Sequence, residues 1–136
     1  MSNLEKTLSI IKPDAVERNL DNEIKQIFEN KGFRILSEKK IKIEKSEAEK
    51  FYKVHETKPF YDELCNYLSS GPILVMILEK ENAVLANREL MGATNPKEAE
   101  EGTIRKKYGI SIDKNSVHGS DSLENAKIEI DFFFKD

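Results

Sequence analysis

Apolar residues along the chain recur at two spacings, one typical of strands and one typical of helices. Residues 7–12 (TLSIIK) are rich in branched apolar side chains and end at Pro13, which predicts a strand. Residues 33–43 begin apolar and end in alternation with charged residues, which predicts a strand with one wet face. The run ILVMIL at 73–78 predicts a buried central strand, and a short strand is expected over 115–119.

The segments between these strands have apolar residues at helical spacing and carry helix start and stop signals. Asp21 is the expected cap of a helix that ends before Gly32. Two further helices are predicted over 61–68 and 82–91. Residues 93–114 form a long irregular stretch with room for one short helix, and loops of this length in compact domains are usually functional or disordered.

Two more helix starts are predicted from capping pairs. Residues 46–49 (SEAE) read as a capping box, and the helix that they open carries Tyr52 and His55. Residues 121–124 (DSLE) read as the cap of a last helix. The resulting order, β-α-β-α-α-β-α-loop-β-α, favours an α/β sandwich of the α+β kind in one domain over 1–136.

The charge of the chain restricts its expected binding partners, and its cysteine content bears on its compartment. The chain of 136 residues has 22 Lys+Arg against 25 Asp+Glu and a net charge of −3, so neither nucleic acid nor a membrane is an expected partner. An anionic ligand must then be bound by a local cluster of cations. Cys65 is the single cysteine, which fits a reducing compartment. No signal peptide is evident, and the longest apolar run is too short to span a bilayer.

Several residues have the chemistry of a phosphate-binding site, although none is a strong signal alone. The common phosphate loops and the common zinc patterns are absent from the sequence. A Ser-His-Asp hydrolase built from His118, Ser120 and Asp121 is disfavoured because no GxSxG motif is present. The candidate phosphate ligands are Lys12, Tyr52, His55, Arg88, Thr94 and Arg105.

His118 stands out because of its neighbours in NSVHGSDS, residues 115–122. A histidine nucleophile needs one free ring nitrogen and a partner that holds the other. Glu129 is the natural partner, and Glu124 remains an alternative. Gly119 is expected to let a phosphate approach closely, and Ser120 with the helix start supplies donors. The alternative is a surface-turn histidine beside a helix cap.

This stretch closely resembles the active-site signature N-x-x-H-G-S-D-[SA] of the nucleoside diphosphate kinase family. Blocks at 7–16, 51–64, 70–84 and 92–109 also resemble that family in order and spacing, so the resemblance covers about residues 5–134. It implies a ferredoxin-like βαββαβ sandwich with a four-stranded antiparallel sheet. It also implies transfer of a γ-phosphate between nucleotides by a ping-pong route through phosphohistidine.

The resemblance assigns roles residue by residue. His118 matches the nucleophile and Glu129 its orienting acid, with Ser120 nearby. The six candidate phosphate ligands match the family's phosphate contacts. Lys12 and Asn115 match the ribose contacts, and Phe60 and Ile112 match the pair that sandwiches the base. Mg²⁺ is expected to bridge the nucleotide phosphates with few or no protein ligands.

The resemblance also implies a cytoplasmic homo-oligomer, with a hexamer favoured and a tetramer as the alternative. Two departures bear on the assembly. Glu101 stands where members often have proline, and the chain stops soon after its last helix. Two other functions stay open: a catalytically silent nucleotide-binding regulatory module, and a phosphohistidine carrier that serves a protein partner.

Overall fold

The structure is a computed structural model that describes residues 4–111 and 114–134. Its centre is a four-stranded sheet in the order β2-β3-β1-β4, in which every neighbouring pair is antiparallel. The strands are β1 (Leu4–Ile11), β2 (Arg34–Ile41), β3 (Ile73–Glu81) and β4 (Val117–Gly119). The predicted antiparallel α/β sandwich is therefore confirmed.

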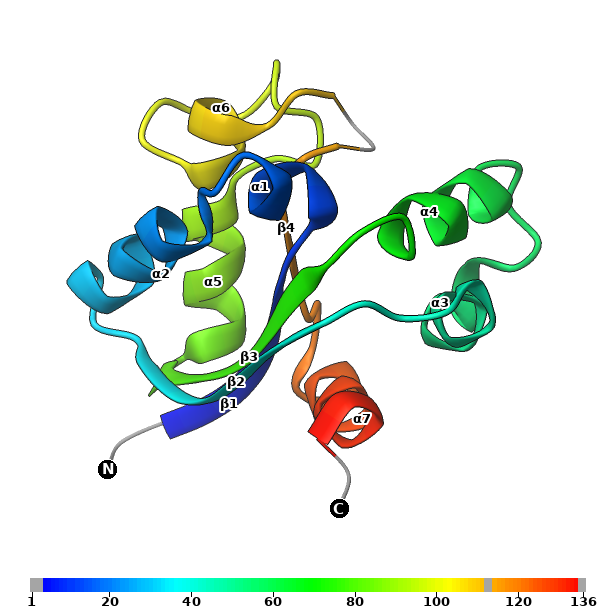
Figure 1. Ribbon diagram of the computed structural model, residues 1–136. Coiled ribbons are helices and arrows are strands. Elements are labelled where there is room, and N and C mark those ends of the chain that lie inside the picture. The colour runs from blue at the N-terminus through cyan, green and yellow to red at the C-terminus, as the bar shows by residue number, and fades with distance from the viewer. Residues whose placement is uncertain (1–3, 112–113, 135–136) are drawn as a thin grey trace.

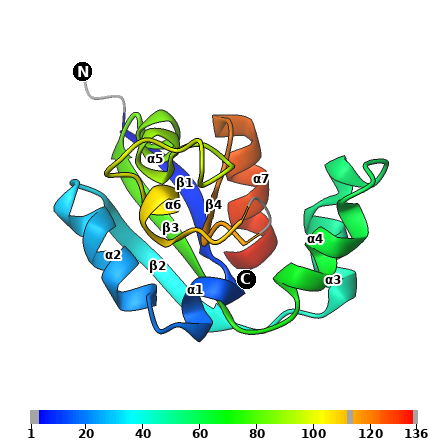
Figure 2. The ribbon, with the colours of Figure 1, turned by 90° about the horizontal axis from the view of Figure 1, so that it is seen from above.

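Helices cover both faces of this sheet. Figures 1 and 2 show α2 and α5 on one face, α7 on the other, and α3 with α4 further out on the side of α7. None of the helices in the described part of the chain is both long and apolar enough to cross a membrane. The helices are α1 (Pro13–Glu17), α2 (Asp21–Asn30), α3 (Lys45–Phe51), α4 (Tyr61–Leu68), α5 (Ala83–Met91), α6 (Ile104–Tyr108) and α7 (Leu123–Phe134), with a 3₁₀ turn, η1, at Lys53–His55.

The strand β1 is buried on both faces, because alternate side chains enter two different cores. Leu8 and Ile10 pack with residues of α3, α4 and α7, whereas Ile11 packs with residues of α2 and α5. A strand with two covered faces reads as a continuous apolar run, which is why its sequence predicted it well.

Three predicted helix starts are wrong in detail. The capping box of α3 uses Glu44 and Glu47, not residues 46–49. Asp21 is the first helical residue and its carboxylate contacts Lys40 at 3.0 Å, so it does not cap α2. At the last helix the hydroxyl of Ser122 accepts the Asn125 N–H at 3.1 Å, which makes Ser122 the capping residue.

Two helical segments also differ from the prediction. The helix α3 ends at Phe51, so Tyr52 and His55 lie in and beside η1, not on α3. The sequence does not predict the short helix α1, because Pro13 directly after an apolar run indicates the end of a strand. Proline is also favoured in the first helical turn, and here it serves both purposes.

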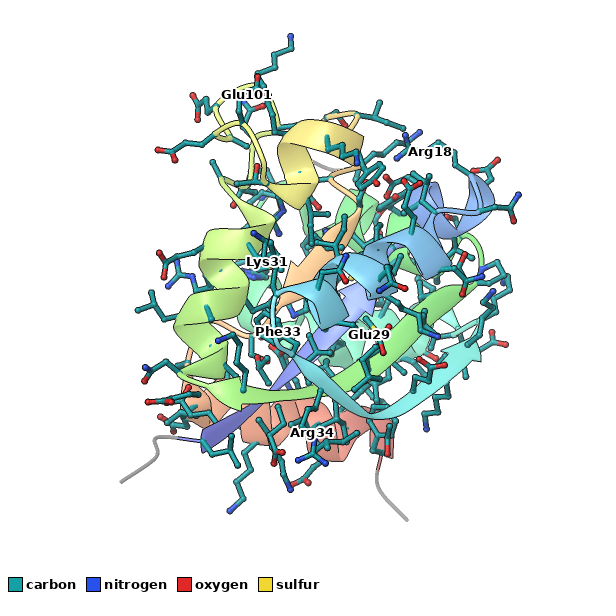
Figure 3. All side chains as sticks on the ribbon, turned by 90° about the vertical axis from the view of Figure 1, so that its left-hand side faces the viewer. Arg18, Glu29, Lys31, Phe33, Arg34 and Glu101 are labelled. Atoms are coloured by element: carbon teal, nitrogen blue, oxygen red, sulfur yellow. The ribbon has the colours of Figure 1, made fainter. Side chains whose placement is uncertain are left out.

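The long segment between α5 and β4 contains the short helix α6. Thr103 caps it by accepting the Lys106 N–H on its hydroxyl at 3.3 Å. Glu101 lies just before this cap, on the outer part of the loop, and is exposed (Figure 3). The segment thus folds back over the edge of the sheet near β4 (Figure 1).

Candidate active site

An open cleft of about 1420 Å³ gathers residues from both ends of the chain. Figures 1 and 2 show β4 between the α3–α4 pair and the α5–α6 side of the molecule. Nine of the predicted site residues line the cleft: Lys12, Tyr52, His55, Phe60, Arg88, Thr94, Arg105, Asn115 and His118. Ile112 lies outside the described residues.

His118 is the central residue of β4 and is partly exposed to the cleft, with 21% of its side chain accessible. Its Nε2 lies 3.0 Å from Oε1 of Glu129 on α7. Glu124, the other candidate partner, is exposed at the start of the same helix. Since Glu129 engages Nε2, Nδ1 is the ring nitrogen left for chemistry.

Ser120 forms hydrogen bonds that hold the Glu129 carboxylate beside His118. Its hydroxyl donates to the same Oε1 atom of Glu129 at 2.8 Å and accepts the Leu8 N–H at 3.3 Å. Ser120 is fully buried. The carboxylate of Glu129 is therefore held by two neighbours, and a chain of hydrogen bonds connects β1 to the imidazole.

Aromatic rings pack against the His118 imidazole. The ring of Phe51 meets it edge to face, with centroids 5.3 Å apart, and the ring of Tyr52 lies at 6.4 Å. Burial and then the nearby Glu129 carboxylate raise the pKa of the Tyr52 hydroxyl, so it remains a neutral donor. Phe51 was not predicted as a site residue, because an aromatic residue on an amphipathic helix reads as core.

Arg105 is a buried cation held by backbone carbonyls. Its Nη1 donates to Gly92 O at 3.0 Å and its Nη2 donates to Val117 O at 2.9 Å. Burial, together with the nearby Arg88 charge, lowers the pKa of Arg105 to about 10, so the group is cationic at neutral pH. Its Nε atom has no hydrogen-bond partner in the described residues. A cation held in this way is suited to an anionic ligand.

Lys12 and Asn115 form a polar pair where β1 ends. Lys12 Nζ donates to Asn115 Oδ1 at 2.9 Å, and Asn115 Nδ2 donates to Thr94 O at 3.1 Å. Both side chains are nearly fully buried. These bonds tie β1, the loop after α5 and the segment before β4 into one wall of the cleft.

A second network lies behind this wall, and sequence reasoning missed it. Ser116 has a left-handed backbone, with φ of 74°, and its hydroxyl donates to Asp14 Oδ2 at 2.8 Å. The Asp14 carboxylate also accepts bonds from Tyr67 and Arg18. Asp14 and Ser116 are distant in sequence, so no local pattern could have paired them.

His55 and Phe60 lie on the other side of the cleft, with ring centroids 5.9 Å apart. Burial, and after it the positive charge of Lys58, lowers the pKa of His55, so the imidazole is neutral at neutral pH. Phe60 is 42% exposed, which leaves a ring face open to stack on a ligand.

Gly119 also has a packing role that the sequence did not predict, in addition to its predicted place beside the phosphate. A Cβ atom placed there would lie 2.2 Å from Asn87 Nδ2 and 2.8 Å from Met91 Cε. Both neighbours belong to α5, and of the two only Met91 also lines the cleft, together with Gly119 itself. Close packing of α5 on β4 therefore leaves little room for a side chain at this position.

The donor set of the cleft suits an anion better than a bare cation. It contains Lys12, Arg88 and Arg105 together with hydroxyl groups. The described residues contain no group of three or more His, Cys, Asp or Glu side chains placed to hold a metal ion. A divalent ion here would have to draw most of its ligands from a bound phosphate compound.

Comparisons with known proteins agree with this geometry. The family model described as nucleoside diphosphate kinase matches residues 5–136. The chain is 60% identical over 132 residues to the nucleoside diphosphate kinase of Campylobacter jejuni subsp. jejuni serotype O:6, covering 97% of this chain and 96% of that protein. It is 56% identical over 131 residues to that of Persephonella marina, covering 96% and 94%.

Solved structures give the same result. The nucleoside diphosphate kinase of Aquifex aeolicus superposes with a TM-score of 0.95 at 39% identity, covering 97% of this chain and 96% of that chain. The enzyme of Encephalitozoon cuniculi superposes with a TM-score of 0.94 at 40% identity, covering 97% and 90%. The fold of these structures is thus the fold of this chain.

Proposed function

Because the chain belongs to the nucleoside diphosphate kinase family, we propose that His118 carries the phosphoryl group between two nucleotides. The protein is a phosphotransferase that moves the γ-phosphate of a nucleoside triphosphate to a nucleoside diphosphate. The observation that carries the proposal is the 3.0 Å contact between Glu129 Oε1 and His118 Nε2. With Nε2 engaged by Glu129, Nδ1 is the proposed nucleophile.

In the first half-reaction Nδ1 attacks the γ-phosphorus in line. A nitrogen–phosphorus bond forms, the bond to the bridging oxygen breaks, and the nucleoside diphosphate leaves with that electron pair. The imidazole becomes positively charged, and the Glu129 carboxylate stabilises this charge while the proton stays on Nε2. The second half-reaction reverses these steps with another diphosphate.

The charge that develops on the transferring group is neutralised by donors that line the cleft. Arg105 and Arg88 supply guanidinium groups, Lys12 an ammonium, and Tyr52 and Thr94 hydroxyls. Arg105 and Lys12 are already held by hydrogen bonds, so these two groups need little reorganisation when the substrate binds. Ser120 acts through Glu129, and His55 contributes a neutral donor at the phosphates.

The remaining wall residues hold the nucleoside. Lys12 and Asn115 are a bonded pair of donors and acceptors suited to ribose hydroxyls. Phe60 offers a ring face for the base, and Ile112 is its proposed counterpart. Stacking on an aromatic ring tolerates any base.

Mg²⁺ is proposed as the cofactor, bound mainly by the nucleotide phosphates, where it neutralises phosphate charge. We further infer one kinase domain over 1–136, supported by the family match over 5–136. A cytoplasmic homo-oligomer is proposed, with a hexamer favoured over a tetramer.

Label transfer tests the function. The protein is incubated with [γ-³²P]ATP and then with GDP. An enzyme yields labelled GTP, a carrier retains the label, and a silent binding module never acquires it. The comparisons offer no support for the latter two functions. His118→Ala should abolish labelling, whereas His55→Ala should retain it. Retained label in His118→Ala would reassign the nucleophile.

A further inference from the structure

The residue after His118 touches a side chain that the phosphate site does not account for. Asn87 lies on α5 and is fully buried. The Cβ position at Gly119 is 2.2 Å from Asn87 Nδ2, and real Cβ atoms essentially never come within 3.0 Å of another atom. The helix α5 therefore rests directly on the backbone of β4 at this point.

The Asn87 amide is also an unsatisfied group. Neither its Nδ2 nor its Oδ1 atom has a hydrogen-bond partner in the part of the chain that the structure describes. Buried polar atoms are nearly always paired, either with protein or with ordered water. An amide in this position therefore points to a partner at the interface of α5 with the sheet.

Ser9 is the residue placed to share that partner. It lies directly opposite Gly119 in the β1–β4 ladder, and residues opposite each other project from the same face of a sheet. Ser9 is fully buried, and among the described residues its Oγ atom is unpaired too. A hydroxyl and an amide that face one interface supply the polar contacts that a buried water needs.

The contact lies between two parts of the phosphate site. Arg88 follows Asn87 on α5, and His118 precedes Gly119 on β4. Arg88 and His118 both line the cleft. The packing of Asn87 on Gly119 thus sets how far the backbone that carries Arg88 lies from the backbone that carries His118. Misplacement by about 1 Å can reduce an enzymatic rate by about 100-fold.

We propose that Asn87 is a positioning residue for phosphoryl transfer. It holds α5 against the Gly119 backbone and joins β1 through a buried water shared with Ser9. The proposal rests on the proposed roles of His118 and Arg88, and Asn87 itself touches no reacting atom.

A double-mutant cycle tests the spacing. Single-turnover phosphorylation by ATP is measured for wild type, Gly119→Ala, Asn87→Ala and the double variant. We expect losses of about 100-fold for Gly119→Ala and about 10-fold for Asn87→Ala. The double variant should recover at least about 10-fold over Gly119→Ala, because removal of the amide relieves the 2.2 Å contact and leaves only the flexible end of Met91, whose Cε lies at 2.8 Å and can move aside.

Two matched controls should keep the wild-type rate. Gly71→Ala adds a methyl group whose nearest neighbour is Pro13 Cβ at 3.7 Å, an ordinary contact. Asn66→Ala removes an exposed amide from α4 that bonds to Asp62. The proposal would be overturned if the controls lost as much of the phosphorylation rate as Gly119→Ala and Asn87→Ala do.

A second phosphoryl donor, phosphoramidate, distinguishes an effect of Asn87→Ala on positioning from an effect on the stability of the fold. In phosphoramidate the phosphorus–nitrogen bond breaks as the bond to His118 forms, and ammonia leaves, so no nucleotide has to be placed by Arg88. Asn87→Ala should slow labelling by ATP and leave labelling by phosphoramidate unchanged. A purely structural role would slow both reactions in proportion to the unfolded fraction.

Additive losses in the cycle, or equal slowing with both donors, would overturn the positioning role. A crystal structure should show an ordered water bonded to both Ser9 Oγ and the Asn87 amide, and a direct bond between the two would overturn the water bridge. Failure of the proposed function would look different, because wild type would then take no label from either donor.

Discussion

Exchange of Glu129 for glutamine removes the charge beside His118 and keeps the size of the side chain. Oε1 of Glu129 lies 3.0 Å from His118 Nε2 and accepts the Ser120 hydroxyl at 2.8 Å. Both contacts use one oxygen atom. A glutamine whose amide oxygen takes that place therefore keeps both hydrogen bonds, and the change isolates the effect of charge.

The size of that effect follows from the burial of the pair. The side chains of His118 and Glu129 are 21% and 19% exposed, so solvent screens their interaction only in part. A hydrogen bond to a charged group contributes about 1.5–3 kcal/mol and a neutral one about 0.5–1.5 kcal/mol. As the imidazole becomes positive, Glu129→Gln therefore loses about 1–1.5 kcal/mol of stabilisation. This loss corresponds to a roughly tenfold slower phosphorylation.

Rapid-quench measurement of phosphoenzyme formation from [γ-³²P]ATP checks this value. Glu124→Gln is the matched control, because Glu124 is exposed at the start of the same helix and should give the wild-type rate. Glu129→Gln at the wild-type rate would show that the carboxylate does not stabilise the imidazole. Glu129→Gln as inactive as His118→Ala would give Glu129 a direct part in the chemistry.

Three further predictions concern the other walls of the cleft. Arg105→Met should lower kcat by about 10²–10³-fold in steady-state assays, since it removes a preorganised donor; a loss confined to KM would contradict that role. Binding of ADP near pH 6 should take up protons, because an anion beside His55 raises the pKa that burial and Lys58 have lowered. Calorimetry in buffers of different ionisation enthalpy measures this uptake, and a His55→Asn variant with unchanged uptake would refute it. Values of kcat/KM for ADP, GDP, CDP and UDP should lie within about one to two orders of magnitude, because Phe60 reads no base edge; a thousandfold preference would require a polar contact to the base.

The sequence alone determined the elements that depend on local pattern. The strands β1 and β3 read as apolar runs because both of their faces are covered, and α4 and α5 were bounded by glycines and apolar spacing. The capping residues of α3 were predicted wrongly, because several carboxylate and hydroxyl side chains near residue 45 compete for the same backbone N–H groups. Their choice depends on how the chain enters the helix from β2.

The sequence also determined which residues could form the site. The NSVHGSDS stretch marked His118, and the spacing of the other blocks marked the residues that the fold gathers into one cleft. These are local signals, because each motif keeps its residue types at fixed separations along one element or loop.

Only the tertiary structure decided how these residues act on one another. The sequence favoured Glu129 as the partner of His118 and left Glu124 as an alternative, and the approach of α7 to β4 brings Glu129 to Nε2 and so leaves Nδ1 of His118 for chemistry. Likewise, Gly119 is required by a helix more than 25 residues earlier in the chain, as its contact with Asn87 shows. Long-range packing sets such distances, and no local sequence pattern encodes them, because the partners meet only when the sheet has formed.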